Sequence, residues 1–431
     1  MAPSWCRASD TTKRASGSPS RATRSLSPVS PKVLVVGAGP AGTACAVELA
    51  RAGATVTVID KARFPRDKCC GDGLTTGALR HLEHLGFDLG TVPSARTTTG
   101  VSLTSPRGRT IDVQLPQEGL YAVVTPRTEL DHALVRHARS FGVEVLEESP
   151  LLLVNANGTT HVTVTVEGIG TRDFDWLVAA DGMWSPTRKM LGLSTEGYLG
   201  EWHAFRQYFT GVTGSASHRM HIWFEKDLLP GYAWTFPLPD GRVNFGYGIL
   251  RSRGMTTKFM GELWDTLLSR AHISEALAGG TPEGRHTAWP IPARIDSAVR
   301  SSGRVLFVGD AVCATDVMSG EGIGQALETG ILAARAITEG QSAADVRARY
   351  SSLIDSHLLA DHRMSVALGR LLTSPVVAEA VLRLVDTNDW TRRNFARWMF
   401  EDEPRAVVFT PRRWHRGFLS RPGAYRGNTH K

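Results

Sequence analysis

Residues 303–330 read GRVLFVGDAVCATDVMSGEGIGQALETG, and this stretch decides the fold. The apolar run at residues 305–308 predicts a buried strand that ends at Gly309 and Asp310. A loop of small residues follows, and the glycines on either side of Glu321 predict a helix start there. The stretch therefore predicts one wall of a nucleotide-binding fold.

A second glycine-rich motif, GAGPAG, occupies residues 37–42, more than 250 residues upstream. It follows a continuous apolar run, as expected of a central parallel strand that is buried on both faces. A helix is predicted at residues 43–52 and a second strand at residues 55–59. These elements make a βαβ unit in about 30 residues.

Each glycine of this motif has a separate physical role. Gly37 permits the tight turn after the strand, Gly39 lets the backbone approach a pyrophosphate, and Gly42 permits close packing of helix on strand. The N-terminus of the helix offers free N–H groups to phosphate oxygens. Asp60, eighteen residues past Gly42, is placed to accept hydrogen bonds from a ribose.

Two such motifs, far apart in the sequence, indicate a long cofactor that is held at both ends, and FAD is the candidate. A third strand–turn–helix pattern, at Asp181 and Gly182, lies between them. Asp310 can hydrogen-bond a ribityl hydroxyl at the end of its strand. The helix that is expected near Glu321 can direct its N-terminus toward the pyrimidine side of a flavin.

In this order and spacing, the three pieces resemble the FAD-binding fold of the para-hydroxybenzoate hydroxylase type over about residues 32–340. The resemblance implies an α/β, Rossmann-like FAD-binding domain with an inserted antiparallel β-sheet substrate domain and C-terminal helices. It also implies that Arg127 contacts FAD. The predicted FAD-binding residues are Gly37, Gly39, Pro40, Ala41, Gly42, Asp60, Lys61, Arg127, Asp181, Gly182, Gly309, Asp310, Gly320, Gly322 and Ile323.

The expected domain organisation is discontinuous. An amphipathic helix is predicted at residues 127–140, and strands at 159–166 and 173–178. We expect a disordered basic segment at 1–30, an FAD-binding domain at 31–100, 125–199 and 286–345, a substrate-binding sheet domain at 101–124 and 200–285, a helical region at 346–403 and a basic tail at 404–431.

Two further segments bear on the reaction. Residues 64–74 read FPRDKCCGDGL and residues 232–237 read YAWTFP. They resemble the Cys-Gly and Tyr-x-Trp-x-Phe-Pro motifs of the geranylgeranyl reductase family, whose members saturate prenyl chains, including the menaquinone side chain. The resemblance implies that Cys70 is catalytic, as a proton donor or a group that shapes the flavin surroundings. It implies a substrate site at Tyr232, Trp234, Phe236 and Pro237.

The leading hypothesis is an FAD-dependent reductase of C=C bonds in a prenyl lipid or prenylquinone, with NADPH as a possible electron donor. A flavin monooxygenase or halogenase on the same scaffold is the alternative. No lysine occurs between Lys68 and Lys189, which counts against a halogenase. A flavoprotein that only binds prenyl or quinone groups and stores electrons is a third hypothesis.

Composition limits the function classes. The net charge of +7 comes from +4 in residues 1–30, +7 in residues 404–431 and −4 in the rest, a distribution that does not suggest nucleic-acid binding. No metal site is predicted, because neither the cysteines nor the histidines have ligand spacing. We expect a cytoplasmic protein with solvated basic ends, which could contact the inner face of an anionic membrane.

Overall fold

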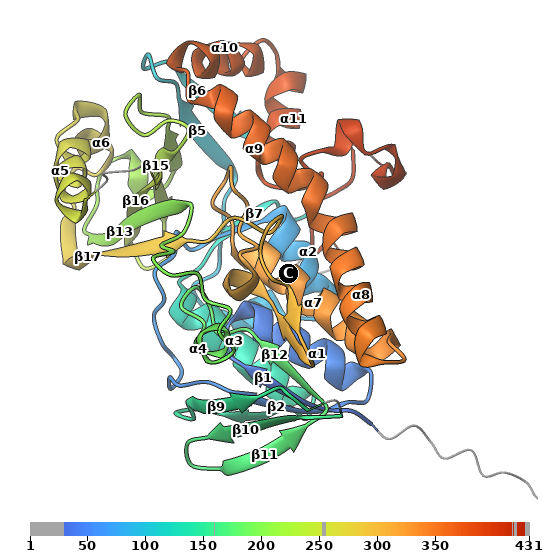
Figure 1. Ribbon diagram of the computed structural model, residues 1–431. Helices are drawn as coiled ribbons and strands as arrows, with labels where there is room; N and C mark the ends of the chain where they lie inside the picture. The colour runs from blue at the N-terminus through green and yellow to red at the C-terminus, as the bar shows by residue number, and fades with distance from the viewer. Residues whose placement is uncertain (1–29, 159, 252–255, 416, 418–419, 427–431) are drawn as a thin grey trace, which may run out of the picture. The chain divides into compact units, whose positions relative to one another are not determined.

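The computed structural model describes residues 30–158, 160–251, 256–415, 417 and 420–426. The predicted disordered segment at residues 1–30 lies outside the described residues, except for Ser30. Residues 31–431 form one compact unit. The predicted fold class is confirmed: a parallel sheet of the para-hydroxybenzoate hydroxylase type is joined to an antiparallel sheet and C-terminal helices (Figure 1).

The first sheet has six strands in the order β18-β19-β12-β1-β2-β8. All neighbours are parallel except β18 and β19. Val35 pairs with Val58 on one side and with Val178 on the other, so the sheet centre is apolar on both faces. The strands are β1 (Lys32–Val36), β2 (Thr55–Ile59), β8 (Glu144–Leu146), β12 (Trp176–Ala179), β18 (Ser301–Ser302) and β19 (Val305–Phe307).

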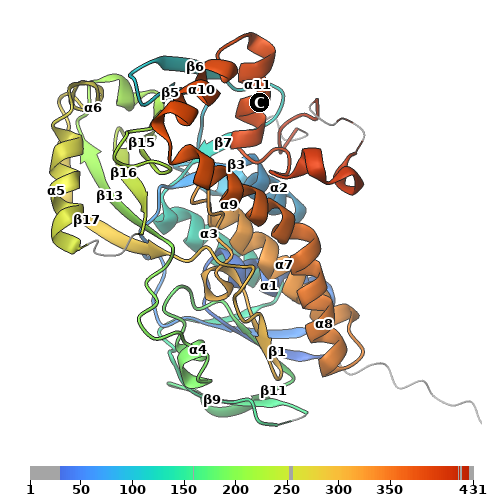
Figure 2. The same cartoon turned by 45° about the horizontal axis from the view of Figure 1, so that its top comes forward.

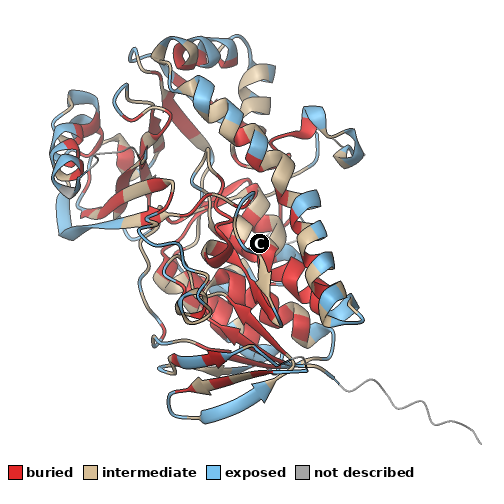
Figure 3. Ribbon diagram, in the orientation of Figure 1, coloured by how far each residue is buried: buried red, intermediate tan, exposed pale blue. Residues whose placement is uncertain are grey.

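Three helices pack against this sheet: α1 (Pro40–Arg51), α3 (Arg127–Ser140) and α7 (Ile323–Glu339). Figure 3 shows the sheet and these helices as mostly buried. α1 and α7 lie so close that a methyl group added at Gly330 would be 2.2 Å from the Ala41 carbonyl oxygen. The two glycine-rich loops, which precede these two helices, are therefore fixed relative to each other.

The prediction of one continuous strand at residues 173–178 is wrong, because two strands of different sheets meet there. The chain changes sheets at Asp175, whose N–H donates to the Lys32 carbonyl while its carboxylate accepts the Lys32 N–H. The residues before it belong to a three-stranded antiparallel sheet whose valines extend the same core. That sheet contains β9 (Leu151–Asn155), β10 (Val162–Val166) and β11 (Gly170–Phe174), and α4 (Pro186–Met190) follows β12.

The second large sheet has seven strands in the order β17-β13-β16-β15-β14-β5-β6, antiparallel except for β14 with β5. Trp264 on α5 packs against Phe245 and Tyr247 on its strands. The elements are β5 (Gly100–Thr104), β6 (Thr110–Gln114), β13 (Trp202–Thr210), β14 (Met220–Trp223), β15 (Tyr232–Pro237), β16 (Val243–Leu250), β17 (Thr281–Ile291), α5 (Thr257–Leu268) and α6 (Ala271–Ala276).

The C-terminal helices lie against both sheets. Figures 1 and 2 both show α8 beside α7, and α11 contacts β6. These helices are α8 (Ala343–Ile354), α9 (Ala360–Leu372), α10 (Pro375–Val385) and α11 (Asp389–Met399). A small sheet and one helix complete the fold: β3 (Gly73–Thr75), β4 (Arg96–Thr97), β7 (Ala122–Val124) and α2 (Thr76–His84).

The prediction that residues 404–431 are a solvated tail is wrong for residues 405–407 and 423–425, which are buried, whereas residues 408–409, 411–412 and 414–415 are exposed. Arg405 is 3% exposed in its side chain and lies between acidic groups. Ala424 exchanges backbone hydrogen bonds with Leu120, and the Tyr425 hydroxyl donates to the Phe87 carbonyl. Charge counting did not predict this burial, because the acidic partners of Arg405 lie elsewhere in the chain.

Among the described residues, no single helix has the length and apolar character to cross a membrane. One pair of helical segments, residues 343–372 and α10, has that length and apolar character only when the two are counted together, and a bend of 112° separates them.

Candidate functional site

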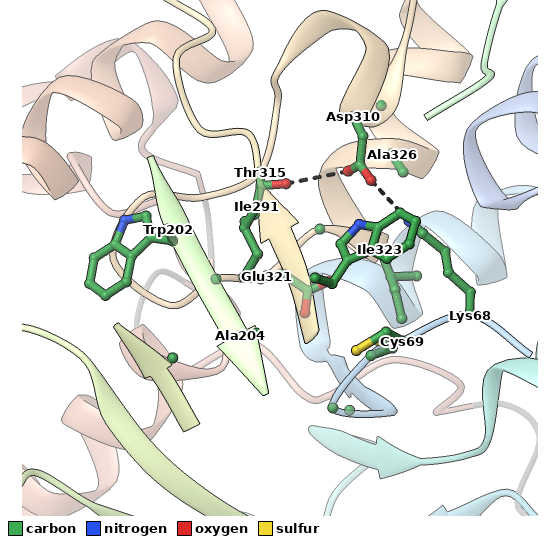
Figure 4. Close-up of a pocket in the computed structure, with 18 of the residues that line it drawn as sticks. Lys68, Cys69, Trp202, Ala204, Ile291, Asp310, Thr315, Glu321, Ile323 and Ala326 are labelled. Carbon is green, nitrogen blue, oxygen red and sulfur yellow. Dashed lines mark hydrogen bonds and ion pairs between the residues drawn. The ribbon is translucent and has the colours of Figure 1, made fainter. Parts of the chain in front are cut away.

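One cavity of about 1190 Å³ runs from the glycine loop before α1 to the C-terminal helices. Its wall brings together residues from β1, the 64–74 segment, both large sheets and the loop before α7. Figure 4 shows part of this wall, in which Glu321 lies between Ile291 and Ile323. The cavity thus joins the predicted cofactor site and the predicted substrate site in one space.

The GAGPAG loop has the geometry that its glycines predict. Gly37 has φ +104°, and a methyl group at Gly42 would lie 1.9 Å from the Gly37 carbonyl oxygen. The Asp60 carboxylate accepts the Ala38 N–H at 2.8 Å and the Ala62 N–H at 2.9 Å, so it fixes the loop at the cavity edge. Of the predicted residues here, the cavity is lined by Gly37, Gly39, Pro40, Ala41, Asp60 and Lys61.

Two guanidinium groups converge on Gly39. A methyl group at Gly39 would lie 3.6 Å from an Arg66 nitrogen and 4.0 Å from an Arg127 nitrogen. Asp131, which is fully buried, holds both: Arg127 donates to it at 2.8 and 2.7 Å, and Arg66 at 2.9 Å. Sequence analysis identified Arg127 but missed Arg66 and Asp131, because nothing in the local sequence indicates that they pair.

Asp181 lies at the turn after β12, where the Thr187 N–H donates to its Oδ2 atom at 2.9 Å. Its Oδ1 atom is buried without a partner, and burial raises the pKa of this carboxyl. Gly182, with φ +80°, completes the turn, and both residues line the cavity. Asp181 therefore holds the turn after β12 at the cavity wall.

Asp310 follows β19 and accepts a 2.9 Å hydrogen bond from Lys68 (Figure 4). Burial alone would raise the pKa of Asp310, but the Lys68 ammonium lowers it below its ordinary value. Lys68 was not among the predicted site residues. Its position three residues after Pro65 carries no local signal for a partner 242 residues away.

The loop before α7 differs in detail from the prediction. The helix begins at Ile323, not at Glu321, because Gly320 has φ +68° and the Glu321 carboxylate accepts the Gly324 N–H at 2.6 Å. A carboxylate thus occupies part of the helix N-terminus that was expected to face a flavin. The predicted residues Gly309, Asp310, Gly320, Gly322 and Ile323 all line the cavity.

The 69–73 loop carries Cys70 into the cavity wall. Burial raises the pKa of the Cys70 thiol to about 11, so the sulfur holds its proton at neutral pH. A methyl group at Gly71 would lie 3.2 Å from the Phe236 ring, and one at Gly73 would lie 3.1 Å from it. The glycines therefore let the loop lie directly on the aromatic wall.

Asp72, which sequence analysis did not select, anchors this loop. It is fully buried with φ +65°, and its carboxylate accepts hydrogen bonds from Tyr208 at 2.6 Å and from Asn244 at 2.8 Å. Asn244 also donates to the Cys70 carbonyl at 2.9 Å. The loop is thus tied to β13 and β16, and the Arg127 N–H donates to Asp72 from α3.

Burial raises the pKa of Asp72 to about 6. An acid whose pKa rises on folding stabilises the fold at low pH, and this contribution is lost as pH rises through the folded value. We expect the free energy of unfolding to fall between about pH 4 and 6, with a contribution of about 2–3 kcal/mol from Asp72. Asp72→Asn, which tolerates positive φ, should flatten this slope in urea titrations.

The matched control is Asp389→Asn, because Asp389 is 99% exposed and should leave the pH dependence unchanged. An unchanged slope in Asp72→Asn would show that Asp72 ionises in the fold as freely as it does in water.

The aromatic wall lies on β15. Tyr232, Trp234 and Phe236 share one face and line the cavity, with ring centroids 6.0 and 6.2 Å apart. Pro237 is buried at the end of the strand and is not part of the cavity wall. The apolar wall continues through Leu368, Leu372, Val381, Leu382, Phe395, Trp398 and Met399 on the C-terminal helices.

The residues at the glycine-loop end fit FAD. Arg66 and Arg127 meet beside the glycine where a backbone can approach a diphosphate, and the Asp60 carboxylate offers an acceptor for a ribose hydroxyl. Gly320 and Gly322 leave space for a flat ring. Within the described residues, no group of three or more His, Cys, Asp or Glu side chains could hold a metal ion.

Comparisons with known proteins agree with this geometry. Residues 30–347 match the family model of an FAD binding domain. Menaquinone reductases of Mycolicibacterium smegmatis and of Mycobacterium tuberculosis (strain H37Rv) are 31% and 32% identical to this chain. Each match covers 80% of this chain. It covers 85% of the length of the first relative and 84% of the length of the second. Digeranylgeranylglycerophospholipid reductase of Methanothrix thermoacetophila is 26% identical over 73% of this chain and 79% of its own.

Solved structures show the same fold. A geranylgeranyl bacteriochlorophyll reductase-like protein of Thermoplasma acidophilum has a TM-score of 0.71 at 21% identity, over 89% of this chain and 99% of its own. The flavin-dependent halogenase CmlS has a TM-score of 0.66 at 21% identity. The match covers 93% of this chain and 75% of the halogenase chain. The family model and the relatives above 30% identity show that the chain belongs to the FAD-dependent oxidoreductases of the geranylgeranyl reductase family.

Proposed function

We propose that this protein reduces C=C bonds of a prenyl chain, on a prenylquinone or another prenyl lipid. The observation that carries the proposal is the single cavity that begins at the cofactor loops and continues along the apolar wall to α9, α10 and α11. A prenyl chain is long, flexible and apolar, and it would be recognised by such a wall rather than by polar groups.

Bound FAD, in its reduced form, supplies the hydride. The protein must place the double bond against it and exclude water, because an isolated alkene is a poor hydride acceptor. Trp234 and Phe236 lie against the loop that carries Cys70, so a chain held on these rings would pass the thiol. Pro237 supports the strand rather than the substrate in this proposal. NADPH is one electron donor to test, since the sequence does not specify the donor.

The quinone class is favoured over the glycerolipid class by the relatives. Those above 30% identity are menaquinone reductases, whereas the digeranylgeranylglycerophospholipid reductase of Methanothrix is 26% identical. A halogenase shares the fold at 21% identity, which carries no argument for its reaction. We therefore infer that a menaquinone side chain is the first substrate to test.

The test is anaerobic. The FAD-loaded protein is reduced, mixed with menaquinone or with a geranylgeranyl lipid, and followed by flavin reoxidation and product mass. A gain of two hydrogens without oxygen supports the proposal. A gain of one oxygen, only in air, would make the protein a monooxygenase, and binding without turnover would make it an electron carrier.

Cys70→Ala should lower the rate of product formation by roughly 10²-fold, because the cavity loses a thiol that carries a proton. Cys69→Ala is the control: this neighbouring thiol hydrogen-bonds at 3.7 Å to the Thr287 carbonyl and should be replaceable. Full activity in Cys70→Ala would remove Cys70 from the catalytic group. Product mass in single-turnover mixing measures both.

Membrane contact through the basic ends stays a prediction, which liposome co-sedimentation of the whole chain would test. In the described part of the C-terminal end, Arg405, Arg413 and Arg426 are ion-paired with acidic residues of this chain. The positive charges of these three arginines are thus partly neutralised within the protein, which reduces the charge that they offer to an anionic lipid.

A further inference from the structure

A second cavity, of about 440 Å³, lies behind the loop that precedes α7. It shares Thr315 and Arg405 with the wall of the first cavity, so the two spaces are separated by a thin layer of side chains. Its character is different, because its wall is rich in ionisable groups, among them His81, Asp316, Glu328, His357, Glu401 and Arg405.

The separating layer is an acidic cluster around one cation. Glu321 lines the first cavity and Glu401 the second. Glu401 accepts from Arg405 at 3.3 Å and from Gln325 at 3.4 Å, and Ser319 reaches it at 3.5 Å. Glu401 follows the end of α11 with φ +58°, the left-handed conformation of a helix C-terminal cap, in which the Asp402 N–H donates to the Arg397 carbonyl at 2.9 Å.

The charges of this layer do not balance if every group is ionised. Asp316 and Glu401 pair with the Arg405 guanidinium at 3.4 and 3.3 Å, and the charges of both carboxylates act on Glu321. Arg405 holds the pKa of Asp316 below the value that burial alone would give, and Ser319 and Ser365 donate to Asp316 at 2.6 and 2.8 Å. Asp316 is thus the partner that stays ionised.

The two glutamates are left to share the remaining proton. Burial raises the pKa of both. The Glu401 carboxylate raises the pKa of Glu321 further, and the Asp316 carboxylate raises that of Glu401. Two further ionisable groups are neighbours. The Tyr232 hydroxyl donates to the Ser319 carbonyl, and the Glu321 carboxylate raises the pKa of the Cys70 thiol. Thr75 contributes a further hydroxyl to Glu401 at 3.3 Å.

We propose that Glu321 and Glu401 form the proton relay of the active site, which carries protons from the polar cavity to the cavity that holds the substrate. The inference rests on the proposed reductase function, because that reaction consumes one proton per double bond. It assigns a role to the glutamate of the Gly320-Glu321-Gly322 segment that cofactor binding alone does not require.

The steps balance as follows. One substrate carbon gains a hydride and its electron pair, and the other gains the proton of the Cys70 thiol, whose S–H bond breaks. The thiolate then takes a proton from the Glu321 carboxyl, which is the stronger acid of the two. Glu321 is reprotonated by Glu401, and Glu401 by water in the polar cavity. The net change is one hydride and one solvent proton added per C=C bond.

The polar cavity offers a route for that water. Glu328 accepts from His357 at 3.0 Å and lies 3.9 Å from His81, so titratable groups continue along its wall. Burial would raise the pKa of Glu328, but the two histidines lower it, so this carboxylate stays ionised beside them. Protons can therefore move between the imidazoles and water without leaving the cavity.

A spectroscopic test needs no turnover. Besides the carboxyl bands expected from Asp72 and Asp181, infrared spectra of the FAD-loaded protein, without substrate, should show a further protonated carboxyl band that titrates well above the ordinary glutamate range of about 4.3. Glu321→Gln and Glu401→Gln should each abolish or shift this titration. Glu379→Gln, which removes a buried glutamate of α10 outside the layer, should not. A spectrum with no such band in the wild type would overturn the relay.

A kinetic test separates the relay from the first chemical step. In Glu321→Gln, a single turnover should proceed within about twofold of wild type, because the thiol still carries its proton. Steady-state turnover should fall at least tenfold and decline further as pH rises. Equal loss in both regimes would make Glu321 a structural residue and overturn the proposal.

The two proposals fail in different ways. If wild-type protein adds no hydrogen to any prenyl substrate, the proposed function is lost, while the infrared titration still reports on the carboxyl pair. If wild-type protein reduces the substrate and Glu321→Gln matches it in steady state across pH, only the relay is lost.

Discussion

Apoprotein with Asp131→Asn should have a free energy of unfolding about 3–5 kcal/mol below wild type. Asp131 has no exposed side-chain surface, and it is the carboxylate on which Arg127 and Arg66 both converge. The amide keeps the shape of the side chain but removes its charge. Two guanidinium groups, one of them buried, would then face each other without a counter-charge.

FAD should restore part of this loss. We place the diphosphate of FAD at Gly39, beside both guanidinium groups, so bound cofactor would replace some of the missing negative charge. Denaturant titrations of apo and FAD-loaded Asp131→Asn measure this difference. An equal loss in both forms would place the diphosphate elsewhere. Glu262→Gln, in an exposed pair of α5, is the control and should change little.

The second large effect is expected at the contact of α1 with α7. Gly330→Val should lower the free energy of unfolding by about 3–5 kcal/mol, because its Cβ would meet the Ala41 carbonyl at 2.2 Å and the Cys45 nitrogen at 3.1 Å. Backbone atoms cannot rotate away, so the helices must separate. Both cofactor loops move with them, and FAD retention after gel filtration should fall with stability.

The control for this substitution is Gly261→Ala on α5, where an added methyl group meets nothing within 4 Å. There the gain in helix propensity should stabilise the fold by up to about 1 kcal/mol. Thermal melts of both variants compare the two cases. If Gly330→Val retained FAD and wild-type stability, α1 and α7 would be able to slide apart without cost.

The parts of the fold that the sequence predicted are those with local causes. The GAGPAG turn needs positive φ at Gly37 and close approach at Gly42, and the flanking valines can only be a buried strand. The helix predicted at residues 127–140 has the bounds of α3, because its apolar spacing is helical throughout. The fold class and the family followed from such local patterns.

What could not be predicted depends on partners far away in the chain. Asp72 meets Tyr208 and Asn244 across more than 130 residues, and neither partner has a distinctive neighbourhood. The change of sheet at Asp175 could not be predicted from residues 173–178, which read DFDWLV, because a strand-like pattern does not encode which strand is the neighbour. Charge counting likewise cannot tell a solvated arginine from Arg405, which is buried among carboxylates.

The packing of the C-terminal residues on α2 has a consequence for synthesis. The Thr76 N–H donates to the Phe400 carbonyl, and Arg80 pairs with Asp402, so α2 waits for partners that are made 322 residues later in the case of Asp402. Domains begin to fold from their N-terminal parts while the ribosome is still translating. Here the first sheet lacks β19 and the α7 cover until residue 339 has been made, and the cavity wall closes later still, when the C-terminal helices follow.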